Sequence, residues 1–566
     1  MRDLRILFPY AGNKVPRTFD VLCLLRMTVL FCTAPQHYLN SKLPSPHSTL
    51  IWFFPLPCPH KLWTRRGFSL PKRIPIFYSA LLLTAVNLLL RLVGTSFQVY
   101  ISGRIGAAGV GLLQLVMSVG SLAMVAGIAG IRTATMYLTA EELGRKKPGN
   151  VTWVLSSCFL YSILCSGMVA ALVYGFAPQI AEHWIGDTRT VDALRLFAAF
   201  LPTTCLCGVM TGYFTAANRI GTLAAVEVAE QLTSMAVTMI ALTLWAGSDA
   251  GRACQCVILG SCLGGCLTLG CLVVLRLRER AGTGTRIPVR SRLMQAAVPL
   301  ALADVLKSGI NTTENLMVPK RLALNALVED PLASFGIVSG MVFPVLMFPA
   351  CILFGLAELL IPELARCAAA GSRRRISYLV QRSLKVAMLY GIFFCGLMFL
   401  LAQPLCLRLY GSAEAGRYLK LYSVLIPMLY CDAITDAMTK GLGQQKACVR
   451  YNILTSAMDV VFLYILLPNF GMDGYFFSFL VTHLVNFALS LRRLLKITGE
   501  SLPFYIPALS AAAAITAIWG ATRLSGPPLQ CAAYLALLGS LLYLFKIIRR
   551  EDIAWVRGLL RSKAPV

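Results

Sequence analysis

The chain has 566 residues, of which 57% are hydrophobic and only 14% charged, and its formal net charge is +27. Soluble domains carry about 25% charged residues, so this composition excludes a soluble globular protein and indicates a polytopic membrane protein. Lys and Arg gather in the loops between apolar segments, where they set the orientation of a membrane protein. We therefore expect no nucleic-acid partner.

The cysteines and short motifs suggest neither a metal site nor a cofactor. Nineteen cysteines are scattered along the chain, and the pair Cys254 and Cys256 has no second pair or histidine cluster nearby in the sequence. Cysteines inside apolar segments act as small apolar side chains. The sequence contains no GxxxxGK[ST] phosphate-binding loop, so we expect no use of ATP. It also shows no Ser, His and Asp arrangement and no metal-ligand arrangement, so we expect no enzyme activity.

The first 72 residues differ from the rest of the chain. They hold many prolines, three of the five histidines and an apolar run at residues 21–32 that Arg26 interrupts. A transmembrane helix needs about 20 consecutive apolar residues, so this run is too short to span a bilayer. We predict a poorly ordered N-terminal extension over residues 1–72.

From residue 73 onward the chain contains about fourteen apolar segments, each bounded by Gly, Pro or charged residues. They cover approximately residues 75–101, 110–138, 151–175, 191–215, 221–246, 252–275, 293–318, 333–361, 380–404, 418–441, 449–468, 472–491, 502–523 and 528–547. The predicted fold class is an all-α polytopic membrane protein with about 14 transmembrane helices.

Positive charge gathers in alternate loops. The basic loops lie at residues 145–147, 276–292, 373–375, 446–450 and 492–496, and a basic tail follows residue 546. The opposite loops at 247–251 and 468–474 contain no Lys or Arg. Because short cytoplasmic loops are enriched in Lys and Arg, we predict a multi-pass protein of the cytoplasmic membrane with both termini in the cytoplasm.

The two halves of the membrane region repeat each other. Leu201-Pro202 recurs as Ile426-Pro427, and the stretch ending at Gly186 resembles the stretch ending at Gly411, in both cases at an offset of about 225 residues. An even number of spans per half relates the halves by an axis along the membrane normal, with the transport path between them. We expect two pseudo-symmetric six-helix lobes and two C-terminal helices.

These expectations divide the chain into six parts. The predicted parts are the extension at 1–72, an N-lobe at 73–275, a basic cytoplasmic linker at 276–292, a C-lobe at 293–495, two further helices at 496–548 and a basic cytoplasmic tail at 549–566.

Ionisable residues in the seventh and eighth segments indicate a water-filled path. Asp304 and Lys307 lie one helical turn apart, Glu314 follows, and Glu358 lies near the end of the eighth segment. Each such group costs about 2.5–3.5 kcal/mol at the bilayer centre on insertion scales, so it usually faces a cavity or a partner. This pattern is typical of a transporter. We expect Asp304 to pair with Lys307 when no substrate is bound.

Four stretches carry a family resemblance. They are GYFTAANRIGTLAAVEVAEQ (212–231), AVPLALADV to LMVPKRL (297–322), FGIVSGMVFPVLMFP (335–349) with LLIPELA (359–365), and LYSVLIPMLY with KGLGQQKA (421–447). In this order they resemble the stage V sporulation protein B branch of the polysaccharide transporters, in the multidrug, oligosaccharidyl-lipid and polysaccharide exporter superfamily, which also contains the MATE-like exporters and the lipid II flippases.

The resemblance implies a V-shaped pair of lobes that alternate access, and an undecaprenyl-type substrate whose diphosphate carries a saccharide, such as a cell-wall or peptidoglycan precursor. The implied partners are this substrate, membrane lipids and a coupling H⁺ or Na⁺, and we expect a monomer. The lipid II flippases bring an arginine into the cavity from the eighth helix, whereas here the eighth segment has no basic residue before Arg366. That departure leaves a related lipid-linked saccharide as the expected cargo.

Basic residues inside the membrane region are candidates for binding the diphosphate. Arg91 and Arg132 lie within the first and second segments, and a guanidinium matches a diphosphate with bidentate geometry. Lys307 is the matching candidate from the C-lobe, and Arg104 is a candidate at the outer mouth. The alternatives are that Arg132 extends to the cytoplasmic surface, that Arg91 pairs with a structural carboxylate, and that Arg104 is an ordinary loop charge.

Acidic residues inside the segments are candidates for ion coupling, in addition to Asp304 and Glu314. Glu227 and Glu230 share one helical face, as do Asp432 and Asp436. A pair of carboxylates in a low dielectric favours uptake of a proton or cation. The alternatives are hydrogen bonds between helices for the first pair and an ion pair with Lys440 for the second.

Three functions compete. The first is a lipid-linked saccharide flippase, the second is a cation-coupled multidrug antiporter of the same fold, and the third is a membrane glycosyltransferase. The glycosyltransferase needs a catalytic carboxylate on a sizeable extracytoplasmic loop, and the loops between the apolar segments are too short. Cavity charge separates the other two, because a basic cavity suits a diphosphate and an acidic one suits cationic drugs.

Overall fold

The computed structural model describes residues 76–145, 149–217, 219–247, 249–278, 289–500 and 505–547. The predicted extension at 1–72, the predicted tail at 549–566 and most of the predicted linker at 276–292 lie outside these residues. Within the described ranges every secondary-structure element is helical, which confirms the all-α class.

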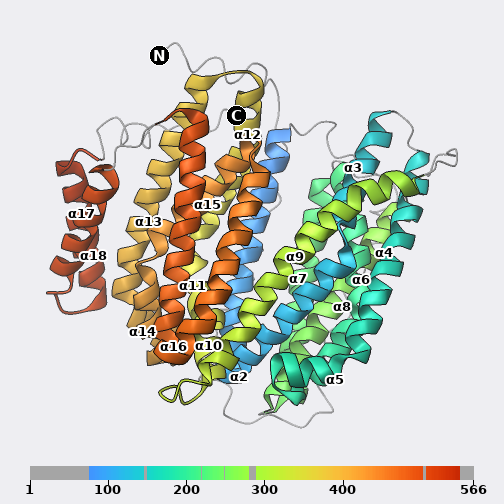
Figure 1. The fold of residues 1–566 in the computed structure, drawn as a ribbon, viewed down its shortest axis with the longest axis horizontal. Coiled ribbons are helices and arrows are strands. Elements are labelled where there is room, and N and C mark those ends of the chain that lie inside the picture. The colour runs from blue at the N-terminus through green and yellow to red at the C-terminus, as the bar shows by residue number, and fades with distance from the viewer. Residues whose placement is uncertain are drawn as a thin grey trace, which may run out of the picture. The chain divides into compact units, whose positions relative to one another are not determined.

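The first half of the chain, blue to green in Figure 1, forms a group of packed helices except for the first run of α2, which lies among the helices of the second half. Its elements are α2 (Ile76–Ile128), α3 (Ile131–Gly144), α4 (Asn150–Gly175), α5 (Ala177–Gln179), η2 (Ile180–Ile185), η3 (Thr188–Thr190), α6 (Val191–Ala216), α7 (Ile220–Ala241), η4 (Leu242–Ala246) and α8 (Ala250–Leu277).

The second half, yellow-green to red in Figure 1, forms another group, and its first helix also packs on helices of the first half. Its elements are α9 (Arg290–Leu322), α10 (Pro331–Gly336), η5 (Ile337–Val342), α11 (Phe343–Met347), α12 (Ala350–Ala369), α13 (Arg373–Tyr410), α14 (Ala413–Ser423), α15 (Ile426–Gly441) and α16 (Gln445–Thr498). The C-terminal helices α17 (Tyr505–Ala521) and α18 (Pro527–Leu544) pack against α13.

The number of spans depends on how bent helices are counted. In the described residues eight helices are long and apolar enough to cross a membrane, or up to ten if each of two bent pairs is one span. This number is below fourteen partly because α2 and α16 each join two helical runs and are counted once. The runs meet at Gly106 and Gly471, whose φ angles of 70° and 57° suit glycine. In addition, α9 carries several charges and α17 is short. Fourteen spans stays a prediction.

The broken helix from α10 to α12 lies at the centre of the largest apolar core. Prolines and the π-helical turn η5 remove regular backbone hydrogen bonds here, and tyrosine hydroxyls from neighbouring helices supply replacements. The hydroxyls donate from Tyr410 to the carbonyl of Met341 (3.1 Å), from Tyr430 to that of Leu346 (3.0 Å) and from Tyr390 to that of Pro349 (2.7 Å).

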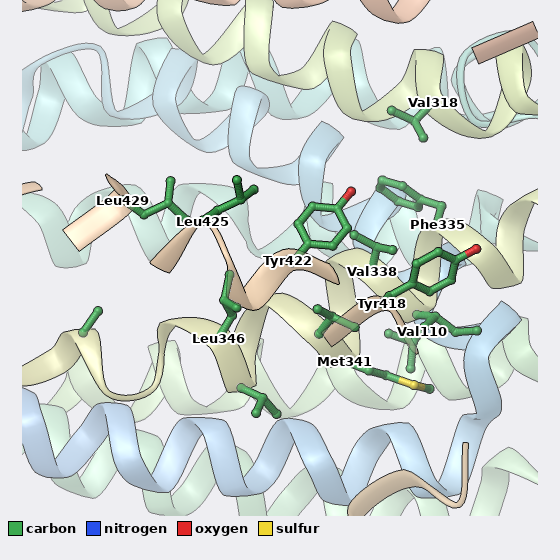
Figure 2. Packing of buried hydrophobic residues seen from close by; sticks show 14 of the residues in the cluster. Val110, Val318, Phe335, Val338, Met341, Leu346, Tyr418, Tyr422, Leu425 and Leu429 are labelled. Atoms are coloured by element: carbon green, nitrogen blue, oxygen red, sulfur yellow. The ribbon is translucent and has the colours of Figure 1, made fainter. Parts of the chain in front are cut away.

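Aromatic packing fills the space around this broken helix. Tyr422 in α14 is fully buried, and its ring makes edge contacts with Phe343, Phe476 and Phe479 at centroid distances between 5.2 and 5.9 Å. Figure 2 shows Tyr422 among the buried side chains of this core, with residues of η5 and α14 close to it. The core therefore joins α14, η5 and α16 into one packed body.

The two halves also meet across α2. A Cβ added to Gly336 of α10 would lie 2.6 Å from the backbone nitrogen of Gly111, so only glycine allows this approach. Farther along α2, Ser118 accepts a hydrogen bond from Thr312 to its carbonyl and another from Asn315 to its hydroxyl, both at 3.0 Å. Helix α9 is thus fastened to the first half by polar contacts.

A second link between the halves lies at the beginning of α9. Arg292 pairs with Glu141 and, at 3.2 Å, with Glu142 at the end of α3. Glu142 is buried and also accepts a hydrogen bond from Asn150 at 3.0 Å, while Arg145 lies 2.6 Å from Glu141. We name this group of five residues the α3–α9 latch.

The predicted repeat has a local structural counterpart. Gly186 and Gly411 end η2 and α13, with left-handed φ angles of 85° and 66°. In each case the next residue, Asp187 or Ser412, caps the following helix through its side chain. A left-handed glycine followed by a helix-capping residue therefore occurs at two places 225 residues apart, which supports the duplication. The lobe boundaries stay predictions.

Candidate functional site

Two carboxylates from distant parts of the chain meet in a polar cluster in the second half. Glu314 of α9 lies beside Ser456 of α16 and close enough to Asp459 for electrostatic repulsion. Asp459 in turn accepts hydrogen bonds from Ser478 at 2.5 Å and from Thr482 at 3.4 Å. We name these five residues the carboxylate cluster.

One oxygen of this cluster is left without a partner. Glu314 Oε1 is buried and accepts no hydrogen bond, although an unpartnered carboxylate oxygen is costly away from water. Tyr475, which hydrogen-bonds with Ser339, completes the surroundings of the two carboxylates. Oxygen atoms arranged in this way suit a proton or a small hard cation, because either one cancels the repulsion of two like charges.

The other acidic pair of the second half is already satisfied. Asp432 accepts two hydrogen bonds from Asn486 Nδ2, at 3.3 and 3.2 Å, and Asp436 forms an ion pair with Lys440 at 2.5 Å. For Asp436 the structure therefore shows the ion pair with Lys440, which was the alternative to an ion-coupling role. Asp432 and Asp436 belong to a different helix pair from Glu314, so the structure does not place these candidates in one site.

The acidic pair of the first half forms a separate group. Glu230 of α7 accepts a hydrogen bond from Thr268 of α8 at 2.7 Å, in line with the alternative of bonds between helices. Glu227 interacts electrostatically with Glu230 and with Arg132 of α3. Arg132 is exposed, and it is the only predicted arginine that the structure places beside predicted carboxylates in its described part.

The candidate cations have different neighbours in the structure. The guanidinium of Arg91 is exposed and lies 4.6 Å from the ring centroid of Phe354 in α12, so it reaches across to the second half. Asp304 and Lys307 are both exposed, and no ion pair joins them among the described residues. Arg104 is exposed and lies 6.0 Å from the ring of Tyr100, next to the turn of α2.

Sequence reasoning identified Glu314 but did not connect it with Asp459 or with the hydroxyls. Ser456 and Asp459 are spaced i, i+3 in one apolar segment, and Ser478 and Thr482 are spaced i, i+4 in the next, so both pairs share a helical face. That spacing was the available signal. The turn of α16 at Gly471 then brings the two faces together.

No group of three or more His, Cys, Asp or Glu side chains in the described residues is arranged to hold a metal ion. Carboxylates buried at membrane depth, such as those of the carboxylate cluster, usually face a cavity or a partner.

The profile of the MatE family matches the chain twice, at residues 84–246 and again at residues 299–465. The two matches together cover more than half of the chain. The chain belongs to the MatE family. One match falls on each half of this MatE chain, in agreement with the internal similarity at Gly186 and Gly411.

Two curated relatives of this MatE chain come from Bacillus subtilis (strain 168). Stage V sporulation protein B is 21% identical over 406 residues, which cover 70% of this chain and 78% of the relative. Sporulation protein YkvU is 24% identical over 190 residues, which cover 33% of this chain and 42% of the relative. The resemblance drawn from the sequence motifs is therefore confirmed.

Solved structures show the same fold. The lipid II flippase MurJ in an inward closed conformation superposes with a TM-score of 0.62 at 13% identity, covering 85% of this chain and 100% of that one. An inward-facing multidrug resistance MATE transporter of the MOP superfamily superposes with a TM-score of 0.60 at 13% identity, covering 74% and 100%. This MatE chain is thus a membrane protein with the fold of MOP-superfamily transporters.

Proposed function

We propose that this MatE-family transporter flips a lipid-linked saccharide with an undecaprenyl-type diphosphate across the cytoplasmic membrane by alternating access. Arg91 carries the proposal, because its guanidinium lies where the first half meets α12 and has no carboxylate partner among the described residues. Such a cation is available to a diphosphate. Similarity to stage V sporulation protein B over most of both chains supports a role in sporulation, and the lipid II flippase MurJ, which shares the fold, is an example of a transporter with a lipid-linked cargo.

The carboxylate cluster supplies the coupling step in this proposal. Glu314 and Asp459 bind H⁺ or Na⁺ and release it during the cycle, so that the gradient drives the change of access. Arg91 and Lys307 contact the diphosphate from opposite lobes, with Arg132 and Arg104 along the route. Both termini lie in the cytoplasm, and the transporter works as a monomer without a cofactor.

The test is a flipping assay in proteoliposomes with a panel of lipid diphosphate saccharides. We expect flipping by the wild-type protein, and loss of about tenfold or more in rate for Arg91→Gln and Lys307→Gln, which corresponds to about 1.4 kcal/mol of activation free energy. Arg417→Gln, a surface cation over Tyr418, is the matched control and should flip at the normal rate. Normal flipping by both test variants would show that Arg91 and Lys307 do not bind the diphosphate.

A cation-coupled multidrug antiporter is the second candidate. The MATE structures share the fold, and the buried carboxylates Glu314 and Asp459 are groups that a cationic drug or a coupling ion can use. The same proteoliposomes loaded with a fluorescent cationic drug decide between the two candidates. Gradient-driven drug movement without flipping of any lipid diphosphate would favour the antiporter.

A further inference from the structure

A groove lies on α9 apart from the carboxylate cluster. It has a volume of about 1100 Å³, and α9 lines it from Val305 to Arg321, with Leu324 just after the end of the helix. Its walls come from both halves of the chain: Trp184 of η2 on one side and Tyr464 of α16 on the other. At 1.5 Å per residue, this part of α9 extends about 24 Å, most of the thickness of the hydrocarbon core.

The groove is apolar along its length and basic at one end. Leu306, Ile310 and Leu316 are among the apolar residues that line α9. Lys320 and Arg321 are adjacent residues in the last turn of α9, and they lie at the end of the groove. Trp184 and Tyr464 flank this basic end, and such aromatic residues are typical of the depth at which lipid headgroups begin.

Neither cation is neutralised by a carboxylate among the residues that the structure describes. Lys320 donates a hydrogen bond to the backbone carbonyl of His183, and the Arg321 guanidinium stacks on the ring of Tyr464 with 3.2 Å to its centroid. No carboxylate forms an ion pair with either cation in the described part of the chain. The lining likewise contains no Asp or Glu. Two positive charges at the end of an apolar groove therefore lack a counter-charge.

We propose that this groove binds an anionic phospholipid of the surrounding membrane. The phosphodiester contacts Lys320 and Arg321, and an acyl chain lies along α9 toward Val305. A guanidinium and an ammonium next to each other bind the oxygens of a phosphodiester through charge-assisted hydrogen bonds. Because the groove is lined by both halves, the bound lipid contacts both and stabilises the arrangement in which they meet there.

Lipid retention tests the charge part of the proposal. The wild-type protein and a Lys320→Gln/Arg321→Gln variant are purified in a mild detergent, and bound lipids are measured by native mass spectrometry. We expect phosphatidylglycerol-type lipid on the wild-type protein and about thirtyfold weaker retention by the variant. Arg417→Gln/Lys420→Gln is the matched control, because these cations also stack on aromatic rings but lie outside the groove, and it should retain the lipid.

A second pair of variants tests the apolar part without changing charge. A Cβ at Gly309 meets no atom within 4 Å, so Gly309→Trp fills the groove without a clash at its base. Gly167→Trp places the same side chain at an equally open position outside the groove. We expect only Gly309→Trp to release the lipid.

Three results would overturn the proposal: wild-type protein without anionic phospholipid, equal retention by the Lys320/Arg321 variant, or a bound polyprenyl diphosphate in place of a phospholipid. The measurement uses protein in detergent and needs no transport. Failure of the flipping assay and failure of lipid retention are therefore distinguishable.

Discussion

At the residue scale, the unusual feature is the pair of carboxylates Glu314 and Asp459. The hydroxyl groups of Ser478 and Thr482 both donate to Oδ1 of Asp459, whereas one buried oxygen of Glu314 has no partner among the described residues. Asp436, by contrast, is neutralised by Lys440 at 2.5 Å. The charge of a carboxylate in an ion pair is already balanced, so it gains little from binding another cation. We therefore expect ion coupling at Glu314 and Asp459.

We therefore expect Glu314→Gln and Asp459→Asn each to remove the dependence of transport on the H⁺ or Na⁺ gradient and to slow transport about tenfold, or about 1.4 kcal/mol in activation free energy. Asp436→Asn is the comparison and should keep gradient-dependent transport. The measurement is transport rate against imposed gradient in proteoliposomes. Full gradient dependence in Asp459→Asn would move the coupling site to Asp304 or to Glu227 and Glu230.

At the element scale, the broken helix from α10 to α12 depends on its neighbours for hydrogen bonds. Tyr430 is buried, and its hydroxyl donates to the carbonyl of Leu346 at 3.0 Å. The same segment packs against α2 through Gly336, where a side chain would meet the backbone at Gly111. One feature satisfies polar groups and the other sets the distance between helices, so each can be tested separately.

Replacing Tyr430 by Phe keeps the ring but leaves the Leu346 carbonyl without its donor. We expect a loss of about 0.6–2 kcal/mol in stability, the range for hydrogen bonds in membrane helices and for buried groups left unpaired. The measurement is thermal unfolding in detergent micelles. Tyr137→Phe is the control, because Tyr137 is exposed and should be replaceable at no cost; an equal change in both variants would contradict the role of the hydroxyl.

Replacing Gly336 by Ala adds one methyl group where there is no room. We expect about 1–3 kcal/mol of destabilisation from overpacking, because α10 must move away from α2. Gly309→Ala, at an open helical position, should be neutral or slightly stabilising, since Ala favours the helix. Thermal unfolding of the two variants side by side gives the answer, and a stable Gly336→Ala protein would show that α10 and α2 adjust freely.

At the scale of the whole molecule, the two halves are joined at separate places. The packing of α10 on α2 is one of them, and the α3–α9 latch is another. Arg292 of the latch crosses between halves, whereas Arg145 pairs only with residues of its own helix. In an alternating-access cycle, contacts between lobes must break in one state and form in the other, so the latch is expected to control opening at its end of the molecule.

Replacing Arg292 should therefore weaken the contact between the two halves at α3 and α9. We expect Arg292→Gln to increase amide hydrogen exchange in residues 139–145 and 289–297, because the buried carboxylate of Glu142 loses its partner from α9. Arg145→Gln should have a smaller effect confined to α3. Unchanged exchange in Arg292→Gln would show that packing of α9 on α2 holds the halves together without the latch.

The amino-acid sequence by itself determined the class of this protein and the approximate positions of its helices. Apolar runs of about 20 residues, turn-forming glycines and basic loops act locally, so they can be recognised without knowing which helices touch. The likeness of the stretches ending at Gly186 and Gly411 indicated the duplication for the same reason. Local patterns also singled out Glu314, Arg91 and Asp436 as charges that need an explanation.

Only the tertiary structure decided which of these charges meet. Glu314 and Asp459 are far apart in the sequence and come together because α9 packs on α16, whose turn at Gly471 adds Ser478. Arg292 reaches Glu142 in the same way, across α3 and α9. The groove at Lys320 likewise exists only where the two halves face each other. A charge inside a membrane needs a partner, but helix packing, not the local sequence, determines which partner lies within reach.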